Sequence, residues 1–232
     1  MNQPLKINLT NELLELENFI IHRSCDIEQW FRIQWLENQA PFYGSVDLRN
    51  SGFKLAPVDM NLFPGGFNNL NPDFAPLAVQ AASVAIEKVC PEAKKVLIIP
   101  EKHTRNLFYL KNLFQFKEIL KNSGLEVRIG TVDSNILEAT DILIDDHQSI
   151  TLEPIQRRDD ILYIKDRDGT EFVPCSVILN NDLSGGVPEK IKDIEQQIIP
   201  PINAGWPTRR KSSHFRYYSQ VAKEFSLLTK SD

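Results

Sequence analysis

Cysteine is scarce in this sequence, and its few copies are poorly placed for pairing. The 232 residues contain three cysteines, Cys25, Cys90 and Cys175, which are widely separated and odd in number. They show neither the CxxC spacing nor the Cys/His spacing of a structural zinc site. This usage is typical of proteins in a reducing compartment. We therefore expect a cytoplasmic protein.

The sequence also lacks any long apolar run. No stretch of 18 uninterrupted apolar residues occurs, and the amino terminus MNQPLKINLTNELLELENF has no positive region followed by an apolar core. We therefore expect no membrane partner and no export.

Basic residues are outnumbered by acidic ones. The chain has 26 Lys and Arg against 31 Asp and Glu, which gives a net charge of -5 and a pI near 5.5. A nucleic-acid partner would need a local basic patch that works against this overall field. The charge therefore predicts no nucleic-acid partner.

What is present is an ordinary globular composition with α/β patterning. The apolar run 96–100, the helical pattern 106–122 and the strand pattern 126–132 together predict a strand–helix–strand unit. Further predicted elements are strands at 141–145 and 177–182, a hairpin with its turn at Asp168-Gly169, and helices at 188–197 and 219–228. We therefore predict an α/β fold with a mainly parallel central sheet.

Helices are also predicted on both sides of a segment rich in proline and glycine. Thr10 and Asp26 are candidate N-caps of two helices that end before Pro41. Pro76 suits the first turn of another helix, 76–89. Apolar residues cover nearly the whole circumference of this helix, so we expect it to be buried on several sides.

The segment 41–76 is predicted to be a long ordered loop. It holds five of the fourteen prolines and four of the ten glycines, which makes regular structure unexpected there. It also holds six aromatic residues, which a disordered linker would lack. Long ordered loops are uncommon and are often binding loops. The alternative is a structural loop that covers a sheet edge.

Charged and amide side chains gather in this loop. They are Asp47, Arg49, Lys54, Asp59, Asn61, Asn68 and Asn69. An arginine fork with a neighbouring lysine suits a small carboxylate, such as that of an amino acid. The alternative is that Arg49 only pairs with Asp47 or Asp59 at the surface.

Polar residues also follow the predicted strand 96–100, at the end where open α/β sheets bind ligands. His103, Thr104, Arg105 and Asn106 lie between this strand and a helix, whose amino terminus presents free N–H groups to anions. The alternative is that Thr104 or Asn106 acts only as an N-cap. No catalytic residue can be named here, because no nucleophile with an orienting acid is recognisable.

A similar arrangement follows the predicted strand 177–182. Asn180, Asn181, Asp182 and Ser184 precede a Gly-Gly pair, but neither GxGxxG nor GxxxxGK[ST] is present. These residues are candidates for binding a small molecule. The alternative is a glycine-rich turn in which Asp182 or Ser184 bonds only to nearby backbone.

The segment AGWPTRRKSSHFRYY (204–218) interleaves basic and aromatic residues. Its candidate phosphate-binding residues are Arg209, Arg210, Lys211, Ser213 and His214. Such a run can bind RNA or the phosphates of a nucleotide. The alternative is that it only forms a solvent-exposed face. Because acidic residues outnumber basic ones in the chain as a whole, a small molecule that carries phosphate is favoured over RNA as the ligand of this segment.

Four segments in this order, VDLRNSGFKLAPVDMNLFPGGFNNL, HTRN, NNDLSGGVP and AGWPTRRKSSHF, resemble the amino-terminal half of a bacterial glutamate-cysteine ligase family with ATP-grasp-like architecture. Together they span about residues 44 to 228. The resemblance implies a Rossmann-like pre-ATP-grasp domain at 41–200, preceded by helices at 1–40. It assigns 201–232 to the start of an ATP-grasp portion.

The resemblance also implies the first step of glutathione synthesis. ATP and Mg²⁺ would activate the side-chain carboxylate of glutamate as an acyl phosphate, which the amine of cysteine then attacks. Arg49 and Lys54 would hold substrate carboxylates, and Arg209, Arg210 and Lys211 would face phosphate. Members of the family look about twice as long as this chain, so we expect these residues alone to be inactive. The alternative function is a non-catalytic module that binds an amino acid or nucleotide.

Overall fold

The computed structural model describes residues 11–51, 55–102, 106–205 and 207–229. The chain divides into two compact units. The helical unit is formed by residues 1–40 and 210–232, and the α/β unit is formed by residues 41–209. None of the described helices is long and apolar enough to cross a bilayer.

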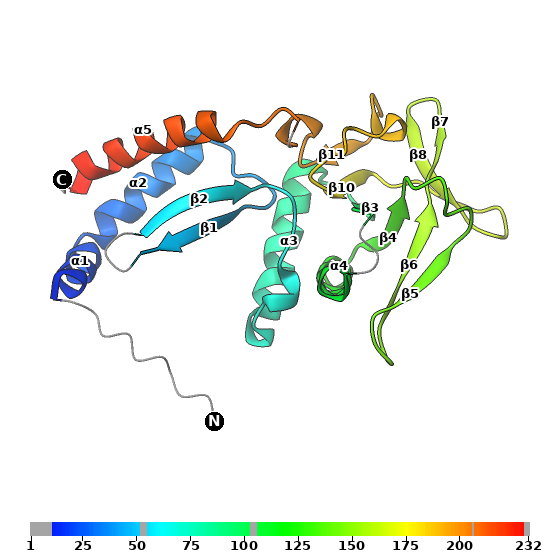
Figure 1. The fold of residues 1–232 in the computed structure, drawn as a ribbon, viewed down its shortest axis with the longest axis horizontal. Helices are drawn as coiled ribbons and strands as arrows, with labels where there is room; N and C mark the ends of the chain where they lie inside the picture. The colour runs from blue at the N-terminus through cyan, green and yellow to red at the C-terminus, as the bar shows by residue number, and fades with distance from the viewer. Residues whose placement is uncertain (1–10, 52–54, 103–105, 206, 230–232) are drawn as a thin grey trace. The chain divides into compact units, whose positions relative to one another are not determined.

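Three helices make up the described part of the helical unit: α1 (Asn11–His22), α2 (Ser24–Glu37) and α5 (Lys211–Thr229). Helix α5 lies along α2 (Figure 1), where the ring of Phe225 is 5.3 Å from that of Trp30 and 6.2 Å from that of Phe31. The aromatic residues therefore hold these distant parts of the sequence together.

Two details of this unit differ from the sequence predictions. Helix α5 begins at Lys211 and not at Ser219, so much of the basic and aromatic segment is helical. Asp26 does not cap α2, because the helix already begins at Ser24 and Asp26 pairs instead with Arg23 at 3.0 Å. The predicted cap Thr10 lies outside the described residues.

The α/β unit is built on a mainly parallel sheet (Figure 1). Among the described residues, six strands follow the order β11-β10-β3-β4-β6-β5, and only β5 runs antiparallel to its neighbour. The strands are β3 (Lys95–Pro100), β4 (Glu126–Thr131), β5 (Thr140–Leu143), β6 (Ser149–Pro154), β10 (Ser176–Asn180) and β11 (Gln197–Ile199). The α/β class and the mainly parallel sheet are thus confirmed.

The two faces of this sheet are covered by different elements, because side chains alternate between faces along a strand. Val96 and Ile98 of β3 pack with helices α3 (Ala75–Val89) and α4 (Leu107–Asn122). Leu97 and Ile99 pack on the other face with side chains of a small antiparallel sheet. Its strands are β7 (Gln156–Arg158), β8 (Ile161–Lys165) and β9 (Glu171–Phe172).

The predicted strand–helix–strand unit is confirmed as β3-α4-β4, and the hairpin at Asp168-Gly169 is confirmed as β8-β9. Asn106 caps α4 by accepting the backbone N–H groups of Phe108 at 3.1 Å and Tyr109 at 3.3 Å. Leu107, the first residue of α4, is 53% exposed although it is apolar.

Helix α3 is less buried than its sequence predicts. Pro76 lies in its first turn as expected. Only Ala82 and Ile86 are buried in it, whereas Leu77 is 60% exposed and Val84 is 46% exposed. The prediction of burial on several sides was therefore wrong, because the central sheet and α4 cover one side of α3 only.

The sequence predicted an irregular loop over the whole of 41–76, but part of this segment is regular. Strands β1 (Ser45–Asn50) and β2 (Leu55–Asn61) form an antiparallel pair in its first half. Val46 and Leu48 alternate with Asp47 and Arg49, which is the period of a strand with one polar face. Pro57 obscured this pattern, yet it lies beside the register shift at Asp47/Leu48, where a strand tolerates proline.

The predicted helix 188–197 is also wrong. A single 3₁₀ turn (Glu189–Ile191) is followed by extended chain and by strand β11. The guanidinium of Arg157 donates to the carbonyl oxygens of Lys192 at 2.6 Å and of Lys190 at 3.3 Å. These carbonyls therefore accept a side chain, and Asp193 has a positive φ of 53°, which ends any helix there.

A charged cluster joins β4 to the β8-β9 turn. Arg128 donates to the two carboxylate oxygens of Asp166 at 2.6 and 3.0 Å and to Glu153 at 3.3 Å. Hydrogen bonding from Arg128 holds the pKa of Asp166 below its ordinary value. Burial raises the pKa of Glu153, and the nearby positive charge of Arg128 opposes this increase. The bidentate contact therefore fastens the small sheet to the central one.

Candidate ligand pocket at the ends of two parallel strands

A pocket of about 470 Å³ opens at the carboxyl ends of β3 and β10. These neighbours pair with Asn180 opposite Pro100, so both strands end at the same level. From β3 the chain continues to β4 on one side, while β10 lies on the other, which makes this a topological switch point. Open α/β sheets bind ligands at such points.

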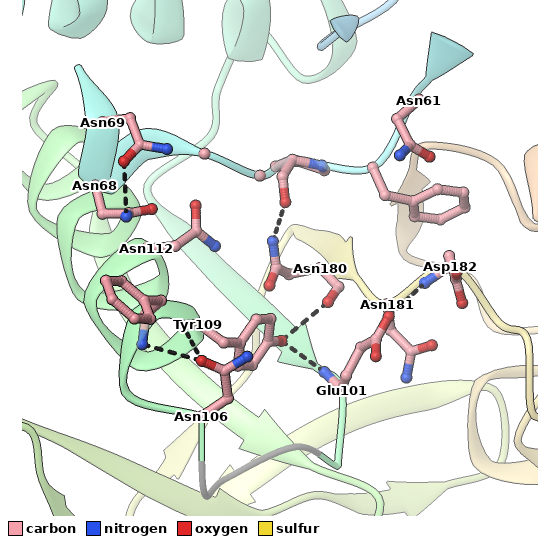
Figure 2. A pocket seen from close by; sticks show the side chains of 15 residues that line it. Asn61, Asn68, Asn69, Glu101, Asn106, Tyr109, Asn112, Asn180, Asn181 and Asp182 are labelled. Atoms are coloured by element: carbon pink, nitrogen blue, oxygen red, sulfur yellow. Dashed lines mark hydrogen bonds between the residues drawn. The ribbon is translucent and has the colours of Figure 1, made fainter. Parts of the chain in front are cut away.

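The walls of this pocket, here called pocket 1, come from three regions of the α/β unit (Figure 2). One is the segment after β2, one follows β3 and enters α4, and one follows β10. The lining residues are Asn61, Phe63, Pro64, Gly65, Gly66, Asn68, Asn69, Glu101, Asn106, Phe108, Tyr109, Asn112, Asn180, Asn181 and Asp182. Amides dominate this set.

The segment 62–70 forms one wall and is fastened by aromatic packing. The ring of Phe67 stacks on that of Phe116 of α4 with centroids 4.5 Å apart. The backbone N–H of Phe67 donates to Oδ1 of Asn112 at 2.9 Å, and the hydroxyl of Tyr43 donates to the carbonyl of Gly65 at 2.6 Å. Gly66 has φ of 76°, which favours glycine. The wall is therefore fixed without a strand partner.

Asn180, the last residue of β10, is held in one orientation. Its side-chain nitrogen donates to the carbonyl oxygen of Pro64, and the residue is only 4% exposed. Its Oδ1 is buried and has no hydrogen-bond partner among the residues that the structure describes. This oxygen has less than 1 Å² of accessible surface, so it is shielded from the open pocket as well as unpaired among the described residues.

Tyr109 ties the two strand ends together. Its hydroxyl accepts the backbone N–H of Glu101 at 2.7 Å and donates to the backbone carbonyl of Asn180 at 3.1 Å (Figure 2). Burial raises the pKa of the Tyr109 phenol above its ordinary value. The hydroxyl therefore stays protonated at neutral pH and holds the β3 and β10 ends in register.

The charged side chains among the described lining residues of pocket 1 are acidic. Among its described lining residues, the charged side chains are Glu101 and Asp182. Glu101 accepts the backbone N–H of Asp182 at 3.4 Å, and Asp182 accepts that of Ser184 at 2.8 Å. A carboxylate accepts hydrogen bonds and does not donate them when it is ionised. The described wall therefore suits a ligand with a cationic group.

A second pocket, of about 390 Å³, shares Glu101 and Asn181 with pocket 1. Its other lining residues are Lys102, Val132, Ser184, Gly185, Gly186, Val187 and Pro188. The two pockets therefore share lining residues beyond the carboxyl ends of the strands. Amides and carboxylates line pocket 1, whereas a lysine and a glycine-rich turn line the second pocket.

The structure brings together seven of the fifteen predicted substrate-binding residues in one pocket. Those lining pocket 1 are Asn61, Asn68, Asn69, Asn106, Asn180, Asn181 and Asp182. Ser184 lines the second pocket. Lys54, His103, Thr104 and Arg105 lie outside the described residues.

The remaining predicted residues do not line either pocket. Asp47 and Arg49 are exposed residues of β1. Asp59 of β2 accepts a hydrogen bond from Arg209 at 3.1 Å, with both side chains about one-fifth exposed. The other predicted phosphate-binding residues, Arg210, Lys211, Ser213 and His214, belong to the helical unit.

Sequence reasoning missed three residues that shape pocket 1. Glu101 directly follows the strand 96–100, so its position alone could have identified it. Asn112 is a buried polar residue on an otherwise apolar face of α4, which was a usable signal. Tyr109 gave no such signal, because tyrosine is common on helix faces.

The described residues contain no group of three or more His, Cys, Asp or Glu side chains that could hold a metal ion. The three cysteines are free.

Comparison with known proteins gives two matches. The model of the glutamate-cysteine ligase family (GshA) matches residues 17–232. Among solved structures, the chain is similar to a protein of Methylobacillus flagellatus KT that is provisionally named gamma-glutamylcysteine synthetase, with 53% sequence identity and a TM-score of 0.90. The match covers 100% of this chain and 54% of that protein, so the chain spans about half of its length. No curated protein matches significantly.

Proposed function

The chain belongs to the glutamate-cysteine ligase family, and from this premise we propose that it serves the ATP-dependent joining of glutamate to cysteine, the first step of glutathione biosynthesis. The name of the similar crystal structure supports this proposal. The activity of the whole enzyme is proposed for a protein of which these residues form a part.

In the proposed reaction, the γ-phosphoryl group of ATP is transferred to an oxygen of the glutamate side-chain carboxylate, and ADP leaves. The amine of cysteine then attacks the carbonyl carbon of this acyl phosphate. The C–N bond forms, inorganic phosphate leaves with the electrons of the C–O bond, and the amine loses a proton. Such a reaction needs both amino acids held in fixed positions while water is excluded.

We assign the binding of an amino acid to pocket 1. The single observation that carries this assignment is the position of the pocket at the switch point between β3 and β10, with an amide and acidic wall around it. Its volume of about 470 Å³ is in the range of small-molecule sites, roughly 300–1,000 Å³. The ligand proposed for it is glutamate.

The contribution of the other predicted residues remains part of the proposal. Arg49 and Lys54 are proposed to hold substrate carboxylates. Arg209, Arg210 and Lys211 are proposed to face the phosphates of ATP, whose charge must be offset during phosphoryl transfer. Mg²⁺ is the metal proposed for such chemistry.

We also propose that the 232 residues bind amino acid without completing the reaction. What supports this proposal is that the match covers only 54% of the similar solved protein.

Isothermal titration calorimetry on the 232-residue chain tests the assignment. Glutamate should bind, and glutarate, which lacks the amino group, serves as the comparison ligand. A coupled assay of ADP release with glutamate, cysteine, ATP and Mg²⁺ should show no turnover. Absence of heat with glutamate would contradict the assignment of pocket 1, and turnover would contradict the inactivity.

A further inference from the structure

The second pocket meets pocket 1 at Glu101 and Asn181, which line both. Asn181 is held in place, because its Oδ1 accepts the backbone N–H of Leu183 at 2.8 Å and its Nδ2 donates to the carbonyl of Pro100 at 3.5 Å. Figure 2 shows Glu101 and Asn181 next to each other at one end of pocket 1. Two small ligands, one in each pocket, would therefore both border Glu101.

Lys102 supplies a positive charge to the second pocket and not to pocket 1. It is exposed, and its ammonium group makes no hydrogen bond or ion pair with any residue in the described part of the chain. Its four-carbon stem is flexible, so the ammonium group can reach an anion anywhere along this side of the pocket. The second pocket therefore has a cation available for a ligand.

The glycine-rich turn borders the same pocket with its backbone. The N–H of Ser184 donates to Asp182 and that of Gly186 donates to the carbonyl of Leu183, each at 2.8 Å. The N–H of Gly185, between them, has no hydrogen-bond partner among the described residues. A Cβ at Gly185 would meet no atom within 4 Å, so the backbone there borders open space that an anion can enter.

The rest of the second pocket is apolar. Val132, Val187 and Pro188 line it, and both valines pack against the core on this face of the sheet. A thiol behaves as a small hydrophobic group, so such a wall suits a short side chain that ends in sulfur. The volume of about 390 Å³ lies in the range of small-molecule sites, roughly 300–1,000 Å³.

We infer that the second pocket binds cysteine, the amino acid that accepts the glutamyl group. Its ammonium group binds to Glu101, its carboxylate to Lys102 and the N–H of Gly185, and its side chain packs on the two valines and the proline. This inference rests on the proposed function and deepens it, because it gives the second substrate a site of its own. Glu101 borders both pockets, so the nitrogen that it binds lies next to pocket 1, where the C–N bond must form.

The expected selectivity follows from the two charged groups of cysteine. Cysteamine lacks the carboxylate, and 3-mercaptopropanoate lacks the ammonium group. Loss of one hydrogen bond to a charged group weakens binding by about 10- to 100-fold. Both analogues should therefore bind more weakly than cysteine. Calorimetry on the full 232-residue chain with a reducing agent measures cysteine, and ligand-observed NMR titration measures the analogues.

Lys102→Met keeps the aliphatic stem and removes the charge. Cysteine and 3-mercaptopropanoate should weaken by about 5-fold, as expected for an exposed ion pair, whereas cysteamine should keep its affinity. Glutamate should also keep its affinity, because Lys102 does not line pocket 1. The control is Lys111→Met, at an exposed position of α4 that lines neither pocket, and it should change none of the affinities.

Glu101→Gln tests the ammonium end independently. Glutamine keeps an oxygen that can accept the backbone N–H of Asp182, so the variant should fold. Cysteine and cysteamine should weaken by about 10-fold, whereas 3-mercaptopropanoate, which has no ammonium group, should not. Glu92→Gln, at an exposed position that lines neither pocket, is the control.

The outcomes separate this inference from the proposed function. Cysteine that competes with glutamate for one site would reject a separate pocket and leave the assignment of pocket 1 intact. Cysteine binding that neither variant alters, or equal losses of all three thiol ligands in both variants, would reject the roles of Lys102 and Glu101. Absence of cysteine binding while glutamate binds would reject the inference alone. Absence of glutamate binding while cysteine binds would contradict the assignment of pocket 1 and not this inference.

Discussion

Replacement of Tyr109 by phenylalanine tests whether one hydroxyl group fastens the site. Tyr109→Phe keeps the ring and removes the oxygen that bonds to the backbone N–H of Glu101 and to the backbone carbonyl of Asn180. Both lost bonds lie at the edge where β3 and β10 end. We expect the variant to fold with lower stability and with weaker glutamate binding.

The expected loss in the free energy of unfolding follows from the two backbone groups that lose a hydrogen bond, the N–H of Glu101 and the carbonyl of Asn180. A neutral hydrogen bond contributes about 1 kcal/mol, and leaving a buried partner unsatisfied costs about 1–3 kcal/mol. Asn180 is 4% exposed, so its carbonyl cannot turn to water, whereas Glu101 is only partly buried. The sum is about 2 kcal/mol, which changes the folding equilibrium about 30-fold.

Urea unfolding at neutral pH, followed by circular dichroism, measures this loss. The midpoint should fall while the slope m stays the same, because the surface exposed on unfolding does not change. Tyr163→Phe is the matched control, since it removes the hydroxyl from a ring of β8 that packs under Arg158 of β7. A loss below about 0.5 kcal/mol, or an equal loss in the control, would refute the reasoning.

Three further predictions concern the sheet, the charged cluster and the pocket wall. Gly130→Ala should destabilise the fold by about 1–3 kcal/mol in thermal unfolding, because a Cβ there would lie 2.6 Å from Cγ1 of Ile155 and 2.8 Å from Cδ1 of Leu97; unchanged stability would contradict this packing. Arg128 lowers the pKa of Asp166, so the stabilisation is present above the ordinary carboxyl pKa of about 3.9 and is lost as pH falls through the lower folded value. Asp166→Asn should therefore be less stable at neutral pH and match the unaltered chain once the pH is below the lowered folded pKa of Asp166, and a difference that persists there would refute the linkage. Phe67→Leu should weaken glutamate binding about 10-fold in calorimetry, because the stacked ring at 4.5 Å from Phe116 holds the pocket wall; unaltered affinity would show that the wall is held in another way.

The sequence was most informative where periodicity and burial agree. The run 96–100 and the helix ending at Ser123-Gly124 carry strong patterns, and the structure confirms both. The hairpin β1-β2 was missed because Pro57 and several asparagines hide a short alternation. The helix predicted at 188–197 failed because Arg157, distant in sequence, bonds to the carbonyls of that segment.

The candidate site was likewise predictable from the sequence only in part. Its location at two strand ends could be predicted from Asn106, Asn180 and Asn181, because ligand sites of α/β sheets lie there. The orientation of each amide could not be predicted, since it depends on Pro64 and Phe67 as hydrogen-bond partners. The predicted roles of Arg49 and Lys54 and the assignment of residues 201–232 to an ATP-grasp portion stay predictions.

Phe116 belongs to the hydrophobic core and also supports the ring of Phe67. The interior of the α/β unit and the shape of the pocket therefore share a side chain and cannot vary independently. A change of volume at Phe116 would alter both the melting temperature and the fit of the ligand, so few residues other than phenylalanine should serve there. Selection for binding would in this way constrain a residue that never touches the substrate.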